Sequence, residues 1–244
     1  MSEAKVELIA KLLAKAERTT PEEAEALTEH AERLMVKYGV EQALIDERRA
    51  RLGQTREEIV QERMLFTGTY ARDIRELGGG VALALGTIRP LQAEHPAGGS
   101  LLYFVGFASD VRQVTLLTAS LQVQSMVAMR TWWKTERALY AWSSEGEKRR
   151  ARSGFVRGFG VGAAARIRES RRSIVEAAGT GTDLVLAGRR DRVDAAADAI
   201  AGGKARRRRG ADALSFSDGH RSGRQANTGG GAITPGRGLA GSGG

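Results

Sequence analysis

The sequence predicts an α+β fold, in which an N-terminal two-helix hairpin precedes a small, mostly antiparallel sheet covered by long helices. Three observations lead to this prediction. Residues 6–38 carry two short runs of helical periodicity, residues 59–107 follow a strand, helix, strand, strand order, and residues 110–178 carry two long helical runs. A short sheet followed by long amphipathic helices is typical of a two-layer sandwich with helices on one face.

The hairpin is the most clearly patterned part of the chain. Apolar residues at helical spacing predict a first helix over residues 6–17 and a second over 21–38. Thr20 is expected to cap the second helix, and Glu23 completes a capping box three residues later. Gly39 is expected to end that helix as a C′ glycine.

A charged, partly helical connector is expected over residues 41–57. A strand at 59–66 and a helix at 71–85 follow it. Two further runs, 87–94 and 100–107, flank a turn rich in glycine and proline and predict a β-hairpin.

Two long helices are predicted next, from 110 to about 137 with Ser109 as N-cap, and from about 145 to 178. A short strand at 183–186 and a helix through Ile200 come after them. A last short helix is expected from Ser215 to Asn227. The domains predicted are therefore a helical hairpin over 1–46, an α+β domain over 57–201, and a basic, glycine-rich, partly disordered tail over 202–244.

Charge is unevenly distributed along the chain. The formal net charge is +9, and the sequence pI is near 10.3. Residues 134–172 hold eleven Lys or Arg against four Glu, and residues 201–244 hold eight against two Asp. Such a basic excess is typical of contact with nucleic acid or another polyanion. Solubility and a compositional preference for arginine over lysine are the alternative explanations.

Ten arginines are the predicted nucleic-acid-binding residues. Six of them fall within an arc of roughly 140° when residues 145–178 are projected as a helix at about 100° per residue. Four more form a run in the tail. They are Arg149, Arg150, Arg157, Arg168, Arg171 and Arg172 on the helix and Arg206, Arg207, Arg208 and Arg209 in the tail. The helix face is expected to lie in solvent or on a polyanion.

Two glycine-rich patterns predict close helix packing rather than phosphate binding. Gly154, Gly158 and Gly162 recur every four residues, and Ser215, Gly219, Gly223 and Asn227 do the same. Such small ridges let two helices approach closely. The G-x-G spacing in the first run has neither a preceding apolar strand nor a Walker lysine, as a nucleotide site would require.

Several chemistries have no support in the sequence. Cysteine is absent, which excludes disulfides and thiolate metal sites, and His30, His95 and His220 have no metal-ligand spacing. No nucleophile motif such as G-x-S-x-G is present. We therefore assign no catalytic residue, cofactor or metal. Residues 1–5 have no apolar run of the kind that a secretory signal requires, and no membrane span is evident, so we expect a cytoplasmic protein without a signal peptide or membrane contact.

Aromatic residues near basic ones suggest a second way to contact nucleic acid. Trp132, Trp133, Tyr140 and Trp142 lie close in sequence to Lys134, and they could stack single-stranded bases. Packing of one tryptophan in the core, with its neighbour at the surface, is the favoured interpretation.

The N-terminal residues resemble a known family. The segments 12–17, 21–27 and 33–40 are similar to the bacterial and phage family catalogued as domain of unknown function 2786. The downstream region resembles the companion often fused to that hairpin, through cues at 104–107, 110–111, 154–155, Gly158, Gly219 and Gly223. The resemblance implies a bacterial, phage or mobile-element setting and carries no catalytic residues.

Two classes of function remain open. The first is a nucleic-acid-binding accessory protein that contacts DNA or RNA electrostatically, with little sequence selectivity. The second is a protein–protein adaptor or assembly factor that docks a protein partner through the hairpin. An enzyme with a dispersed carboxylate site is the less favoured third class.

Overall fold

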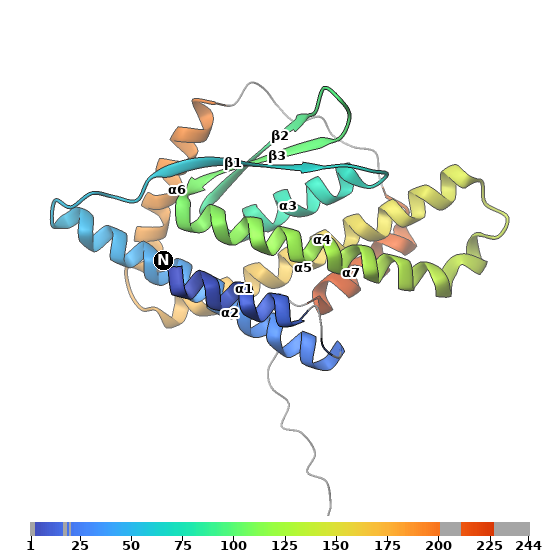
Figure 1. Ribbon diagram of the computed structural model, residues 1–244, viewed down its shortest axis with the longest axis horizontal. Helices are drawn as coiled ribbons and strands as arrows, with labels where there is room; N and C mark the ends of the chain where they lie inside the picture. The colour runs from blue at the N-terminus through green and yellow to red at the C-terminus, as the bar shows by residue number, and fades with distance from the viewer. Residues whose placement is uncertain (1–2, 17–18, 20, 201–210, 227–244) are drawn as a thin grey trace, which may run out of the picture.

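The computed structural model describes residues 3–16, 19, 21–200 and 211–226, and it confirms an α+β fold (Figure 1). Its elements follow the predicted order almost throughout. They are α1 (Glu3–Ala16), α2 (Pro21–Arg51), β1 (Ile59–Phe66), α3 (Ala71–Leu85), β2 (Ile88–Glu94), β3 (Ser100–Phe107), α4 (Ala108–Glu136), a 3₁₀ turn (Arg137–Tyr140), α5 (Glu145–Ala177), α6 (Thr182–Asp198) and α7 (Ala213–Gln225).

The three strands form one antiparallel sheet in the order β1-β3-β2. Ile59 pairs with Phe107 at one end of β1, and Ile88 pairs with Gly106 on the other side of β3. Strands β1 and β2 therefore run parallel on either side of β3, with α3 as the crossover between them. The β2–β3 hairpin was predicted from its turn residues.

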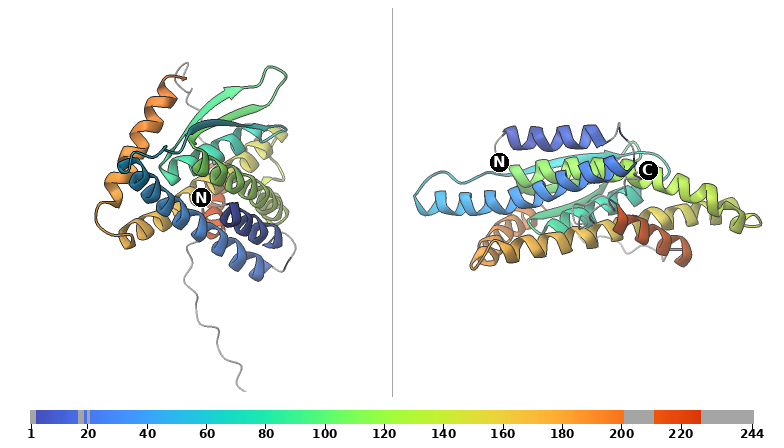
Figure 2. Two further views of the ribbon diagram at one scale, coloured as in Figure 1. Left: turned by 60° about the vertical axis from the view of Figure 1, so that its left-hand side comes forward. Right: turned by 90° about the horizontal axis from the view of Figure 1, so that it is seen from below.

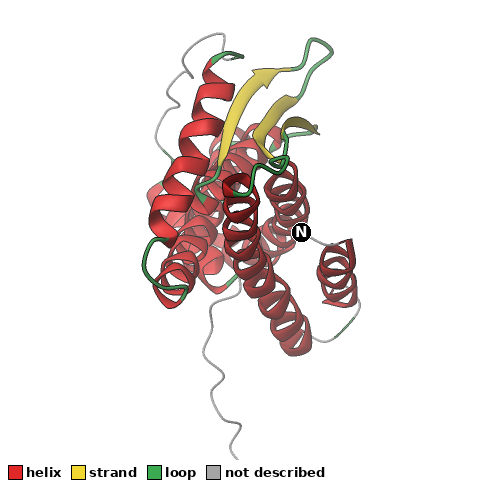
Figure 3. Cartoon of the chain, turned by 90° about the vertical axis from the view of Figure 1, so that its left-hand side faces the viewer, coloured by secondary structure: helices red, strands yellow, loops and turns green. Residues whose placement is uncertain are grey.

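The sheet forms an outer layer, and α3 and α4 pack beneath its inner face (Figures 1 and 3). Leu102 and Phe104 of β3 point into this core, where they join Leu77 of α3 and Leu117 of α4. Helices α1 and α2 lie on the far side of α4 from the sheet (Figure 2). Helix α6 also contacts β2 and β3. The sequence predicted that helices would cover one face of the sheet, and helices are not confined to one face.

Helix α2 is longer than the sequence pattern indicated. Gly39 does not end it, because its φ is not positive and the helix continues to Arg51. At this position a Cβ would lie 3.5 Å from the Gln113 side chain of α4, which is an ordinary van der Waals contact, so neither the backbone nor the packing requires glycine here. Most of the predicted connector is therefore the last part of α2.

Two further local predictions are wrong. Residues 183–186 belong to α6 instead of forming a strand, since Leu186, Val193 and Ala197 are buried at helical spacing. Ser109 is not the N-cap of α4, because the helix begins one residue earlier. Its backbone N–H donates to Glu57 Oε1 at 2.6 Å instead of lying free at the helix end.

The glycine ridges are confirmed as a packing device between α5 and α7. A Cβ on Gly158 would lie 2.0 Å from the backbone oxygen of Phe216. A Cβ on Gly219 would lie 2.0 Å from the backbone oxygen of Phe155. Contacts this short leave room for hydrogen alone, so the two backbones touch directly.

Some predictions fall on residues outside the described part of the chain. They concern the Thr20 cap, the Arg206–Arg209 run and Asn227. Within the described ranges, none of the helices has the length and apolar character that a membrane crossing requires.

Candidate anion-binding pocket

Helix α3 packs along the arginine arc of α5, which sequence analysis did not foresee. The two helices run parallel: the Ser153 hydroxyl donates to Asp73 at 3.0 Å, and Arg157 pairs with Glu76 at 3.3 Å. Further along, a Cβ on Gly80 would lie 3.7 Å from Ala164. The predicted continuous arginine face is therefore interrupted in its middle by α3.

The six helix arginines consequently fall into separate environments. Arg157 is half-buried against Glu76. The other five lie towards the two ends of α3, with Arg149 and Arg150 near its N-terminus and Arg168, Arg171 and Arg172 further along α5. All but Arg157 and Arg171 are exposed.

The arginines at the C-terminal end of α3 have a structural explanation. Arg190 donates to the backbone oxygen of Gly86, the C-cap residue of α3, at 2.9 Å. A Cβ on Gly86 would lie 3.0 Å from the Arg171 guanidinium, which places that group at the same helix end. Cations are favourable there because helix C-termini carry partial negative charge. Burial and the nearby Arg190 lower the pKa of Arg171.

The arginines at the N-terminal end of α3 border a cavity of about 460 Å³. Its walls are the loop 68–70, the first turn of α3, the turn end of the β2–β3 hairpin and the first turns of α5. Arg72, Arg149 and Arg150 line it. The volume lies within the range of roughly 300–1,000 Å³ that is typical of ligand pockets.

Positive charge in this cavity is only partly compensated. Arg150 approaches Glu147 at 3.9 Å, and Arg72 approaches Glu94 at 3.6 Å. Arg149 has no ion pair with any of the described residues. Glu94 also accepts a hydrogen bond from the mostly buried Arg75 at 2.9 Å.

The second carboxylate of the cavity, Asp73, is buried and accepts the Ser153 hydroxyl. Helix N-termini carry partial positive charge, so arginines near them are unfavourable unless an anion is present. The arrangement is suited to binding a phosphate or a carboxylate. Tyr70 is the N-cap residue of α3. The pKa of its hydroxyl is raised, mainly by burial.

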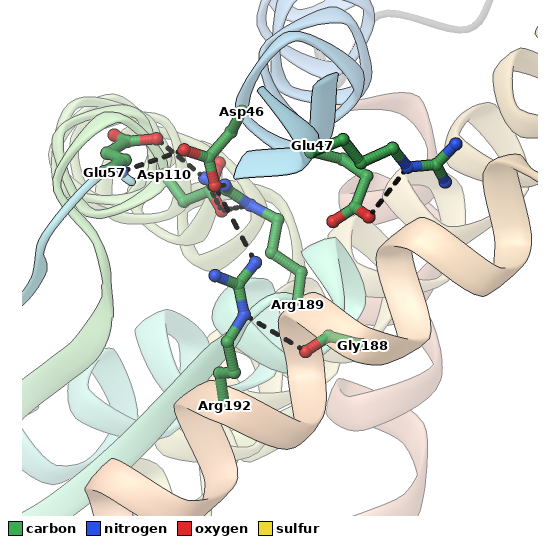
Figure 4. Close-up of polar contacts among 8 residues, drawn as sticks. Asp46, Glu47, Glu57, Asp110, Gly188, Arg189 and Arg192 are labelled. Carbon is green, nitrogen blue, oxygen red and sulfur yellow. Dashed lines mark hydrogen bonds and ion pairs between the residues drawn. The ribbon is translucent and has the colours of Figure 1, made fainter. Parts of the chain in front are cut away.

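A second polar constellation lies in the interior, around Arg189 of α6 (Figure 4). Its guanidinium is 1% exposed and bonds Asp46 of α2 at 3.1 Å, Glu57 at 2.9 Å and Asp110 of α4 at 3.3 Å. It also lies 3.6 Å from the ring centroid of Phe107. The four charged residues come from four segments of the chain, and the sequence pattern gave no signal that would unite them.

The carboxylates around Arg189 differ in their electrostatics. Burial raises the pKa of Asp110 despite the adjacent guanidinium. The pKa of Glu57 is lowered, because hydrogen bonds from Ser109 and Arg189 together outweigh its burial. This interior cluster is a structural junction, since the Arg189 group is inaccessible to a ligand.

The tryptophan cluster follows the favoured interpretation. Trp132 stacks on Phe155 with ring centroids 4.9 Å apart, and its indole N–H donates to Asp218 of α7 at 3.0 Å. Trp133 is half-exposed, with the Arg152 guanidinium 4.9 Å from its ring centroid. Trp142 lies close to these two tryptophans in sequence, but its side chain is fully exposed.

The fold and the pocket define a small α+β protein with a basic cavity between a crossover helix and a long arginine-rich helix. Residues 6–42 match the family described as "Protein of unknown function (DUF2786)". No curated protein and no solved structure matches the chain. Among the described residues, no group of His, Asp or Glu is arranged to hold a metal ion.

Proposed function

We propose that this protein binds nucleic acid through the basic cavity at the N-terminal end of α3. The observation that carries the proposal is the pairing of Arg149, which has no ion pair among the described residues, with Arg150 beside a cavity of about 460 Å³. Phosphate is the anion that a nucleic acid presents repeatedly, and arginine binds it through paired N–H groups. Contacts of this kind position a strand without selecting its sequence.

The setting proposed is an accessory role in a bacterium, a phage or a mobile element, within the cytoplasm. The family match over residues 6–42 supports this setting only through the resemblance of the hairpin. We also propose that the residues downstream of the hairpin correspond to the companion region that is often fused to the hairpin in that family. The excess of basic residues over the whole chain supports a polyanionic partner.

An adaptor role is the second candidate, and exposed apolar residues on the hairpin favour it. Leu8 of α1 and Leu44 and Ile45 of α2 are exposed, and Leu52 just beyond α2 is 67% exposed. Such side chains can form part of a protein-binding surface. The same experiment separates the two candidates, because an adaptor without nucleic-acid affinity does not respond to DNA or RNA.

Replacing Arg149 and Arg150 together with glutamine is expected to flatten the salt dependence of binding. If each arginine contacts one phosphate, the log–log slope should decrease by about 1.4 for a single strand and about 1.8 for a duplex. Fluorescence anisotropy with labelled DNA and RNA over a salt series measures this slope. Both residues are exposed, so the variant should keep the unfolding temperature of the unmodified protein.

Arg168 and Arg172 provide the matched control, because both are exposed arginines of the same helix that do not line the cavity. Their double replacement with glutamine should change the slope less. A larger change in the control pair would contradict the pocket as the binding site. Binding that neither pair alters would assign it to the Arg206–Arg209 run. No measurable binding by the unmodified protein would favour the adaptor.

A further inference from the structure

The turn between α4 and α5 carries an aromatic side chain that the fold does not use. Trp142 is fully exposed, and within the described part of the chain no aromatic ring or cation packs on it. Leu139, in the preceding 3₁₀ turn, is 72% exposed. Fully exposed tryptophan is unusual in a folded protein, because an indole buries a large apolar area when it can.

The neighbouring tryptophans show that this exposure is not a property of the whole cluster. Trp132 is held by Phe155 and Asp218, and Trp133 packs against Tyr140 at a centroid distance of 5.4 Å. Both rings therefore have partners within the protein. Trp142 alone of the three projects from the turn, which forms the far right end of the molecule in Figure 1.

The chain segment that carries Trp142 is basic. Residues 130–153 hold seven Lys or Arg against three Glu. Ser144 and Glu147 form a capping box that fixes the start of α5 at Glu145, three residues after Trp142. Arg149 and Arg150 follow only four and five residues into that helix, roughly 6–8 Å along its axis. An exposed aromatic ring close to arginines that border a cavity is the combination by which proteins hold single-stranded nucleic acid.

We infer that Trp142 stacks on an unpaired base of a single-stranded nucleic acid whose phosphates contact Arg149 and Arg150. This inference rests on the proposed function and adds the class of strand. A duplex hides the faces of its bases between their neighbours, whereas a single strand can turn one outwards onto an indole. The basic chain segment favours a polyanion over an apolar protein surface as the occupant.

The test compares Trp142→Ala with the unmodified full-length protein. The probes are an oligothymidylate of about 12 nucleotides and a mixed-sequence duplex of the same length, at one salt concentration. The unmodified protein should prefer the single strand. The substitution should weaken single-strand binding roughly 5- to 150-fold and leave duplex binding unchanged. Trp142→Phe should keep most of the affinity for the single strand. In this variant the oligonucleotide should quench less of the tryptophan fluorescence than it does in the unmodified protein.

Leu139→Ala is the matched control, since it removes an exposed apolar side chain from the same turn without removing a stacking surface. It should leave both affinities unchanged. Single-strand affinity that survives Trp142→Ala would overturn the inference but not the proposed function. The inference would also be overturned if Trp142→Ala and Leu139→Ala both lost affinity for phosphatidylserine vesicles while both kept their affinity for the single strand. That result would assign the turn to contact with a membrane surface. Absence of binding to either nucleic acid by the unmodified protein would overturn both proposals.

Discussion

Replacing Arg189 with methionine is expected to destabilise the protein by about 3–5 kcal/mol at neutral pH. The substitution keeps much of the side-chain volume but removes the cation that Asp46, Glu57 and Asp110 share. Three carboxylates would then lie close together, two of them almost fully buried, with Arg192, 3.7 Å from Asp46, as their one remaining ion-pair partner among the described residues. A loss of this size is a large fraction of the 5–15 kcal/mol that a typical domain has in total.

The dependence of this loss on pH distinguishes charge from packing. Without the guanidinium, the pKa of both Glu57 and Asp110 should rise in the folded state above its value in the unfolded chain. A carboxyl with a raised folded pKa destabilises the protein above that pKa, and the penalty disappears as the pH falls below the unfolded value. The difference between variant and unmodified protein should therefore be largest near pH 7 and shrink towards about pH 4.

Urea unfolding at several pH values measures the effect, and Arg190→Met is its control. Arg190 lies next to Arg189 on α6, but it is exposed and donates to the backbone oxygen of Gly86. Its replacement should cost about 1 kcal/mol or less. A loss in Arg189→Met that is the same at every pH would show that packing on Phe107, and not the carboxylates, is responsible.

Periodicity alone predicted most of the secondary structure. The helix at 71–85 and the strands at 59–66 and 100–107 lie where the pattern placed them. The pattern failed where one short run fitted two structures. The apolar run 183–186 suits a strand by composition, yet it joins α6, whose residues Leu186, Val193 and Ala197 are buried at helical spacing.

The candidate site was predicted only in part, because it depends on which elements meet. Helical projection correctly grouped the arginines of α5 on one arc. It could not show that α3 would pack on that arc, with Glu76 against Arg157 and Leu77 against Gly160. The cavity beside Arg149 exists because α3 begins there, and no spacing within α5 contains that information.

The glycine ridges lead to the second large expected effect. Gly219→Ala should separate α7 from α5, because the added Cβ would lie 2.0 Å from the Phe155 oxygen, and backbone atoms cannot move aside as a side chain can. Overpacking typically costs about 1–3 kcal/mol and occasionally more. Alanine has a higher helix propensity than glycine by about 1 kcal/mol. The measured loss of stability is therefore the free-energy cost of the clash minus this gain.

Hydrogen exchange of the α7 amides is the direct measurement, since their protection should fall while that of β3 persists. Trp132 supplies a second readout, because its indole N–H loses Asp218 when α7 departs. Gly188→Ala on α6 is the control: apart from the neighbouring residues and backbone of its own helix, no atom lies within 4 Å of the added Cβ, so the substitution should stabilise the protein by about 0.5–1 kcal/mol. If Gly219→Ala behaved like this control, the two helices could not pack as closely as the ridges require.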